Sequence, residues 1–429
     1  MNHFNNHKSY HDMSDCVPHG NPKRESAPIQ NKPMKTTLLV TKLLRNDKTY
    51  IATALYQEKK LLEVHLERLN SENILGNIYI GRVKNIVKNL NAAFIEIAPG
   101  VPCYYSLENC SQPLYSKKIN SPRMVQGDEV VVQVIRENSG NKPAKVSTNL
   151  NFTGKYLVLT SENTSIGISK KLDAEVRQRL QKTLSFDKIC DFGIIVRTNA
   201  AYASEEEIQE EYQLLKQEYL HLKETFLHRT AFCCLKKQMP EYLSSIQNLN
   251  QEQFDTILTD DLELFEHIQQ YLKQFQPRDI EKLTLYQDDL LSLNKLYSLD
   301  TRLQEALQER VWLKSGGYLV IQPTEALTVI DVNSGKSIAK KQAQEHYLKI
   351  NLEAAAEIAH QLRLRNLSGI VIIDFIDMKS RVDNDTLMKT LRNCVCKDPV
   401  PVQVVDMTRL HLVELTRKKV RKPLKEQFL

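Results

Sequence analysis

The sequence predicts a multidomain α+β protein, and three observations support this fold class. Short apolar segments separated by turns fill residues 72–150, which is typical of a small antiparallel barrel of the OB type. An apolar stripe at helical spacing follows Ser204. Near the C-terminus, two aliphatic segments, at residues 327–333 and 370–377, flank a helical pattern and indicate a strand–helix–strand unit.

Length and composition set the outer limits. The 429 residues suffice for two to four domains, and 58 Lys and Arg against 52 Asp and Glu give a formal charge of +6, which permits a polyanionic partner without requiring one. The apolar runs are too short for a membrane helix, and no signal-peptide pattern opens the chain, so we expect a cytoplasmic protein. The eight cysteines form no CxxC pair, which favours reduced thiols over disulfides or a zinc site.

The N-terminal half reads as a tail, a set of strands and one long helix. Residues 1–33 are rich in Asn, His, Ser and Pro and are predicted to be disordered, with Met34 as a candidate true start. Short strands are expected between Thr36 and Leu69, followed by the barrel and by two further strands, at 155–159 and 193–197. Ser204 and Glu207 form a capping-box pattern at the start of the helix.

The C-terminal half reads as a helical region followed by an α/β unit. Residues 240–312 form a polar helical stretch, and residues 318–322 and 327–332 predict a hairpin. A helix over about 340–365 then leads into the strand at Ile370. A right-handed crossover brings parallel strands side by side, so Asp331 and Asp374 are expected to face one crevice at the strand ends.

Each of these two acidic residues follows an aliphatic segment that is predicted to be a buried strand. A buried carboxylate is costly unless neutralised, and two of them side by side suit a hard cation such as Mg²⁺. Asn333 points to the same side as Asp331 and supplies a further oxygen, whereas Asp377 is expected to cap or brace the site. The alternative is that the strand-end aspartates cap the helices that follow them.

Six short motifs in the C-terminal part of the chain resemble the ribonuclease E/G family, and the resemblance as a whole covers about residues 34–422 in the family's order. They are VWLKSGGY (311–318), TVIDVNS (328–334), NLEA (351–354), QLRLRNL (361–367), VIIDFIDM (371–378) and ELTRK (414–418). The resemblance implies a DNase I-like α/β catalytic subdomain over 306–429, in which Asp331 and Asp374 hold Mg²⁺ and Asn333 assists catalysis. It also implies endonucleolytic hydrolysis of single-stranded RNA that leaves a 5′-phosphate, in RNA processing such as rRNA maturation and in mRNA decay.

The resemblance also labels the upstream regions. It implies an RNase H-like subdomain in two parts, 34–71 and 240–305, with an S1 RNA-binding domain (72–150) inserted, and a 5′-sensor subdomain at 151–239. The residues implied to bind RNA in the S1 domain are Phe94, Tyr104 and Lys142. Those implied to bind the 5′-phosphate are Gly154, Val158, Lys170, Arg197 and Thr198. Periodicity alone instead places Phe94 in the barrel core, and without the resemblance Arg197 is an ordinary strand-end cation.

Departures from the family pattern keep a second function open. The chain carries no CxxC zinc link and no small dimerisation domain after the catalytic region, so a zinc-linked dimer is not expected. Pro401 stands where the family carries a basic residue, and the basic run 417–422 either grips RNA or is a solvated helix end. The alternative to a nuclease is therefore an RNA-binding protein with little or no catalysis.

Overall fold

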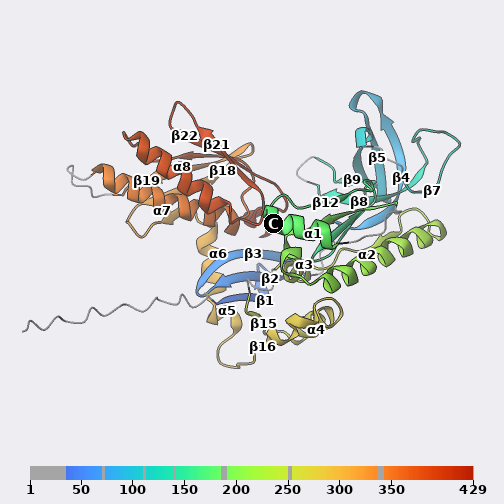
Figure 1. Cartoon of the computed structure of the whole chain (residues 1–429), viewed down its shortest axis with the longest axis horizontal. Helices are drawn as coiled ribbons and strands as arrows, with labels where there is room; N and C mark the ends of the chain where they lie inside the picture. The colour runs from blue at the N-terminus through green and yellow to red at the C-terminus, as the bar shows by residue number, and fades with distance from the viewer. Residues whose placement is uncertain are drawn as a thin grey trace, which may run out of the picture. The chain divides into compact units, whose positions relative to one another are not determined.

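The computed structural model describes residues 35–69, 73–109, 113–138, 142–184, 191–249, 254–335 and 343–428 (Figure 1). The expectations for residues 1–33 and for Met34 lie outside these ranges. Four β-sheets and eight α-helices occur within them, which confirms the mixed α+β class.

The first sheet joins segments from distant parts of the chain. Three antiparallel strands continue into two parallel strands, in the order β16-β15-β1-β2-β3. The strands are β1 (Thr36–Arg45), β2 (Lys48–Gln57), β3 (Lys60–Arg68), β15 (Thr256–Thr259) and β16 (Leu283–Leu285). The same region holds the helices α3 (Glu241–Asn248), α4 (Leu262–Phe275), α5 (Leu293–Leu296) and α6 (Leu299–Leu307). The prediction that residues 240–312 are purely helical is therefore wrong, because β15 and β16 extend the sheet formed by residues 36–68.

The second sheet closes into the predicted barrel. Five strands pair in a ring, β4-β5-β6-β9-β8, and β4 pairs back with β8. The ring strands are β4 (Ile78–Val87), β5 (Ala92–Ala98), β6 (Val101–Ser106), β8 (Glu129–Arg136) and β9 (Lys145–Ser147). Two short strands, β7 (Tyr115–Lys117) and β14 (Cys234–Lys236), pair with β8 and β4. Closure removes the free sheet edges that would otherwise invite association.

The third sheet packs against the long helix that begins after Ser204. Its strands are β10 (Asn151–Thr153), β11 (Leu157–Thr160), β12 (Ile166–Ile168) and β13 (Gly193–Val196), accompanied by α1 (Ala174–Thr183) and α2 (Glu205–Thr225). The capping box is confirmed, because Ser204 Oγ accepts from the Glu207 amide at 3.2 Å and the Glu207 carboxylate accepts from the Ser204 amide at 2.8 Å. The apolar stripe of α2 is buried in the core.

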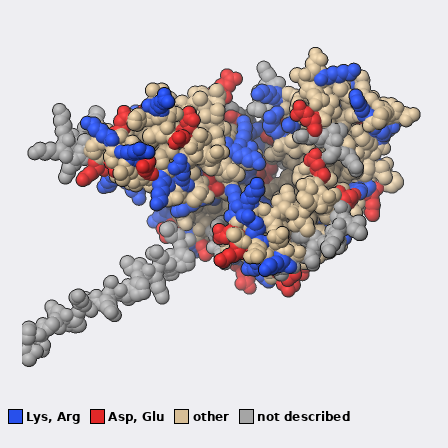
Figure 2. Space-filling model, turned by 45° about the horizontal axis from the view of Figure 1, so that its top comes forward, with Lys and Arg blue, Asp and Glu red and all other residues tan. Residues whose placement is uncertain are grey.

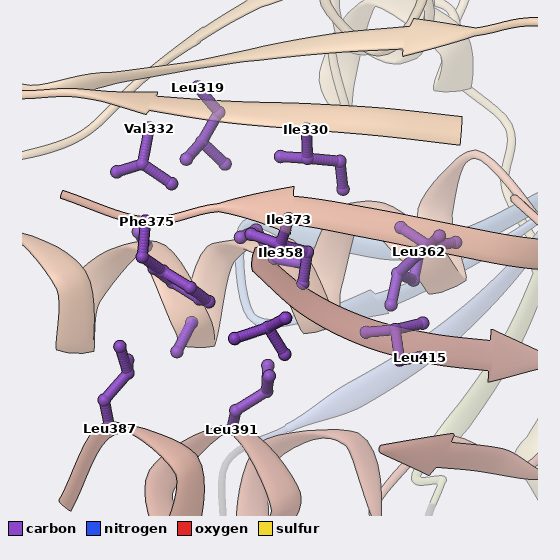
Figure 3. Close-up of a cluster of buried hydrophobic side chains, with 14 of the residues drawn as sticks. Leu319, Ile330, Val332, Ile358, Leu362, Ile373, Phe375, Leu387, Leu391 and Leu415 are labelled. Atoms are coloured by element: carbon purple, nitrogen blue, oxygen red, sulfur yellow. The ribbon is translucent and has the colours of Figure 1, made fainter. Parts of the chain in front are cut away.

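The fourth sheet is the C-terminal α/β layer. Its strand order is β17-β18-β19-β20-β22-β21, and α7 (Ala343–Leu364) and α8 (Arg381–Val395) pack against it. The strands are β17 (Arg310–Trp312), β18 (Tyr318–Pro323), β19 (Leu327–Asn333), β20 (Gly369–Asp374), β21 (Val402–Met407) and β22 (Leu412–Arg417). The β18–β19 hairpin and the parallel β19–β20 pair are both confirmed. Figure 3 shows the core that forms between strands and helices, with Ile330, Ile373 and Leu391 among its members.

Alternating burial distinguishes the two faces of this sheet. Thr328, Ile330 and Val332 of β19 are buried, whereas Val329 and Asp331 are exposed. The helices therefore cover one face, and the opposite face, here called the open face, bears exposed side chains. The expectation that both acidic strands are wholly buried is wrong, because an aliphatic run can place half of its side chains outside.

Across the residues that the structure describes, no helix combines the length and the apolar character needed to cross a membrane.

Candidate functional site

Asp331 and Asp374 lie next to each other on the open face. They are Cα partners in the parallel pairing of β19 with β20, where strands lie about 4.8 Å apart. Both side chains are exposed, on the face without helices. The structure thus confirms their juxtaposition but places them on the sheet surface rather than in a crevice beyond the strand ends.

Asn333 completes the group. Its Nδ2 donates to Asp331 Oδ2 at 2.6 Å, which leaves its carbonyl oxygen as an acceptor. Partial burial raises the pKa of Asp374, and the charges of Asp331 and Asp377 raise it further. The two carboxylates therefore repel each other, and a cation between them would stabilise both.

The helix-capping alternative is wrong for Asp374. Helix α8 is capped by Ser380, whose side chain accepts from the Asp383 amide at 3.3 Å. Asp377 does not cap it either: its side chain is 86% exposed, with His411 Nδ1 at 4.0 Å from its Oδ1.

The donor set of this group fits a hard cation. Mg²⁺ binds carboxylate oxygens and retains several waters, so one or two protein carboxylates are its usual share. In the parts of the chain that the structure describes, this site included, no group of three or more His, Cys, Asp and Glu residues is arranged to hold a metal ion, so the protein's share here is two carboxylates and the Asn333 amide oxygen. The described cysteines, Cys103, Cys233, Cys234, Cys394 and Cys396, are free thiols.

Two residues of α7 fix the loops beside the carboxylates. Asn351 is fully buried, donates from Nδ2 to the Ile376 carbonyl at 2.7 Å, and accepts from the Ile376 amide at 3.1 Å. Glu353 accepts from the amides of Lys314 at 2.5 Å and Ser315 at 3.1 Å. The sequence signal for Asn351 was a polar residue within an apolar helical stripe, but only the structure reveals its partner.

The aromatic residues assigned to the barrel share its outer surface. Phe94 and Tyr104 are cross-strand partners, with ring centroids 6.3 Å apart in a T-shaped arrangement. Both are half-buried, whereas their neighbours Ala93 and Ile95 form the barrel core. Phe94 therefore does not belong to the core, and the alternative that periodicity favoured is wrong.

A cation beside this aromatic pair, Lys145, was not predicted. Lys145 is the Cα partner of Tyr104 in β9, and its Nζ lies 5.9 Å from the Tyr104 ring centroid. Lys142, the predicted residue, is exposed at the beginning of the same segment. The alternation Lys145-Val146-Ser147, with only Val146 buried, was the available signal.

On the face shown in Figure 2, Lys and Arg side chains gather in an interrupted band with Asp and Glu beside it, in line with the small net charge.

Four of the five residues assigned to 5′-phosphate binding lie in or next to the paired strands β11 and β13. Gly154 lies in the β10–β11 turn, Val158 is in β11, and Arg197 and Thr198 follow β13, which pairs with β11. Lys170 is exposed two residues beyond β12, which pairs with β13 on the other side. The Arg197 guanidinium donates to the Gly154 carbonyl and, at 2.6 Å, to Asn248 Oδ1. Its fork therefore binds protein groups in this structure.

An unpredicted acidic residue organises the same turn. The Glu211 carboxylate accepts from the amides of Lys155, Tyr156 and Leu157 at 2.7–2.8 Å. Burial raises the pKa of Glu211, while these amides and the Arg197 charge lower it. A Cβ on Gly154 would lie 2.3 Å from this carboxylate, which explains the glycine. Glu211 lies three residues after Ile208 and therefore on the apolar side of α2. An acidic residue on that side of a helix indicates a hydrogen-bond partner inside the protein.

The C-terminal basic run is largely paired within the protein. Arg417 is buried and donates to both carboxylate oxygens of Asp398 at 2.8 and 3.2 Å. Arg421 contacts Glu241 at 2.5 Å, and Lys422 contacts Glu137 at 3.0 Å. Residues 418–423 are not helical. The reading of residues 417–422 as a solvated helix end is therefore wrong.

Comparison with known proteins agrees with the motifs. The model of the "Ribonuclease E/G family" matches residues 151–420. Ribonuclease G of Haemophilus influenzae is 33% identical over 385 residues, covering 86% of this chain and 78% of that protein. Ribonuclease G of Escherichia coli is 30% identical over 380 residues (85% and 76%), and ribonuclease E of H. influenzae is 32% identical over 388 residues (88% and 41%). The chain belongs to the ribonuclease E/G family.

Proposed function

We propose that this protein is a Mg²⁺-dependent endoribonuclease that cuts single-stranded RNA. The observation that carries the proposal is the in-register pair Asp331 and Asp374, with Asn333 hydrogen-bonded to Asp331. Exposure of both carboxylates on the open face of the sheet leaves room for an extended RNA strand. Membership of a family whose relatives are named ribonucleases supports the same reaction.

In this mechanism Asp331 and Asp374 would hold the cation. When bound, Mg²⁺ would activate a water molecule and stabilise the negative charge that develops on the scissile phosphate. Asn333 orients the Asp331 carboxylate through its amide, and its carbonyl oxygen is available to position the water that attacks. Asn351 holds the backbone that follows Asp374 and so fixes the direction of that carboxylate.

We assign the remaining regions to subdomains that would bind and position the RNA. We assign residues 34–71 and 240–305 to an RNase H-like subdomain, 72–150 to an S1 domain, 151–239 to a 5′-sensor subdomain and 306–429 to a DNase I-like catalytic subdomain. The shared sheet of residues 36–68 and 256–285 and the closed barrel between them support these boundaries. Phe94 and Tyr104 would stack on unpaired bases, with Lys142 and Lys145 neutralising phosphates.

The proposal includes a 5′-phosphate site, which requires the Arg197 guanidinium to give up one of its present hydrogen bonds. Its guanidinium would have to exchange the Asn248 side chain for a phosphate oxygen. Thr198, which follows Arg197 directly, and Lys170, which follows the strand paired with β13, would supply further contacts. Comparing cleavage of 5′-monophosphorylated and 5′-triphosphorylated RNA tests this assignment. Faster cutting of the monophosphate is expected, and equal rates would show that the pocket does not sense the 5′ end.

The test of the main proposal is a cleavage assay on A/U-rich single-stranded RNA, with Mg²⁺ or with a chelator. Internal cuts that leave 5′-phosphates are expected only with the cation, as in RNA processing and decay. Tight binding without cleavage would instead favour the alternative, an RNA-binding protein with little catalysis.

A further inference from the structure

The open face of the catalytic sheet carries an aromatic and cationic cluster that the proposed chemistry does not use. Trp312 of β17 and Tyr318 of β18 have ring centroids 5.2 Å apart. The Arg310 guanidinium carbon lies 4.5 Å from the Tyr318 centroid and 5.7 Å from that of Trp312. We refer to Arg310, Trp312 and Tyr318 as the stacking cluster.

Packing does not account for the position of Trp312. Its neighbour Val311 turns to the helix side and packs against the sheet core, whereas Trp312 is 65% exposed. Exposing so large an aromatic side chain forfeits the apolar burial that such residues normally provide. The Arg310 guanidinium lies closer to the Tyr318 ring than to the Trp312 ring, and the large exposure of Trp312 leaves its indole accessible to a ligand.

The strand register places the cluster beside the proposed catalytic group. Trp312 pairs with Tyr318, which in turn pairs with Asn333. In the next row, Arg310 pairs with Val320, which pairs with Asp331, the partner of Asp374. Paired residues share a face of a sheet, so Trp312 lies two strand spacings, about 10 Å, from Asn333 on the same surface.

We propose that the stacking cluster is a base-binding subsite, in which the Trp312 indole stacks on a nucleotide next to the scissile phosphate and Arg310 faces the RNA backbone. The inference rests on the proposed nuclease function, because the cleavage site defines which nucleotide is bound. An unpaired base suits the site, since it offers an exposed π-face, whereas bases in a duplex are stacked on one another. The subsite would hold the strand across Asp331 and Asp374.

The size of the effect follows from stacking energies. Base–aromatic stacking is worth about 1–3 kcal/mol per base, which corresponds to about 5- to 150-fold in affinity. Trp312→Leu, which keeps an apolar side chain but removes the ring, is expected to raise KM for short RNA within this range. Trp312→Phe should retain part of the affinity. Ile370→Ala is the matched control, because Ile370 is 49% exposed on the same face, lies four residues before Asp374 in β20, and has no ring on which a base could stack.

A direct test uses the fact that Trp312 is the only tryptophan in the chain. The full-length protein is titrated with an end-labelled single-stranded RNA in chelator, so that no cleavage is expected. Label anisotropy reports total binding, and indole emission reports contact at residue 312. Free N-acetyltryptophanamide with the same RNA corrects for absorption by the bases.

We expect saturable quenching of the indole emission that follows the anisotropy curve, and the same quenching with the Ile370→Ala variant. RNA binding that leaves the indole emission unchanged would overturn the subsite, as would a Trp312→Leu variant that binds and cuts short RNA like the wild type. Quenching by RNA that is never cut, even with Mg²⁺, would support base stacking while overturning the nuclease proposal.

Discussion

Replacing Asn351 by Leu tests how the fold holds the catalytic strand end. The Asn351 side chain forms two hydrogen bonds with the backbone of Ile376, two residues beyond Asp374. Leucine has the same branching and number of side-chain heavy atoms, although its methyl groups are larger, and it leaves the Ile376 amide and carbonyl without these partners. An unsatisfied buried polar group costs about 1–3 kcal/mol, and Ile376 is only half-buried, so we expect a loss of about 2–4 kcal/mol in unfolding free energy.

The same substitution should reduce catalysis more than binding. Asp374 would no longer be held in one direction, and a displacement of about 1 Å in a catalytic group can cost about 100-fold in rate. We therefore expect kcat to fall by about this factor, with KM for RNA nearly unchanged. Urea unfolding followed by Trp312 emission measures the stability, because Trp312 belongs to the same sheet.

The control for this experiment is Asn384→Ala. Asn384 donates a single hydrogen bond, at 3.3 Å, to the Met378 carbonyl in the same loop, so its loss should cost less than about 1 kcal/mol and little activity. A stable Asn351→Leu variant with wild-type kcat would refute the reasoning. So would equal effects of the two substitutions on kcat.

Two further predictions concern other parts of the molecule. Phe94→Ala and Tyr104→Ala should each weaken binding of single-stranded RNA by about 1–3 kcal/mol. The control is Leu90→Ala, which should leave binding unchanged although Leu90 is 61% exposed on the same barrel. If the Phe94 and Tyr104 variants keep the wild-type affinity in an anisotropy titration, this barrel surface does not bind RNA. Burial alone would raise the pKa of Glu63. The hydrogen bond from His65 and the charge of the Arg363 guanidinium outweigh burial and hold that pKa well below its usual range. The ionised carboxylate therefore stabilises the fold above the unfolded-state pKa of about 4.3, and this contribution is lost as the pH falls below it. Urea midpoints measured from pH 7 down to 3 should fall less steeply for Glu63→Gln than for the wild type, and parallel curves would contradict this account.

Sequence reasoning predicted features that depend on a single helix or on one strand–helix–strand unit. The pairing of Asp331 with Asp374 could be predicted because a strand–helix–strand unit has a fixed hand. The capping box at Ser204 depends on residues three positions apart. Both were confirmed.

The features that escaped prediction depend on distant partners. Strand β15 has only four residues, and its pairing with β1 joins Thr37 to Thr256, more than 200 positions away. The role of Glu211 is visible only once the turn at Lys155 packs against α2. The exposure of both carboxylates could not be predicted, because an apolar run does not reveal whether one face of its sheet or both are covered.

The most direct test of the central claim is the rate of RNA cleavage by Asp331→Asn and Asp374→Asn variants in Mg²⁺, measured together with their RNA affinity. The matched control is Glu325→Gln, which removes an exposed carboxylate from the hairpin turn that leads into β19. If the two aspartates hold the catalytic cation, both variants lose cleavage and still bind RNA, while the control cuts at the wild-type rate. Cleavage at the wild-type rate by either aspartate variant would contradict the assignment.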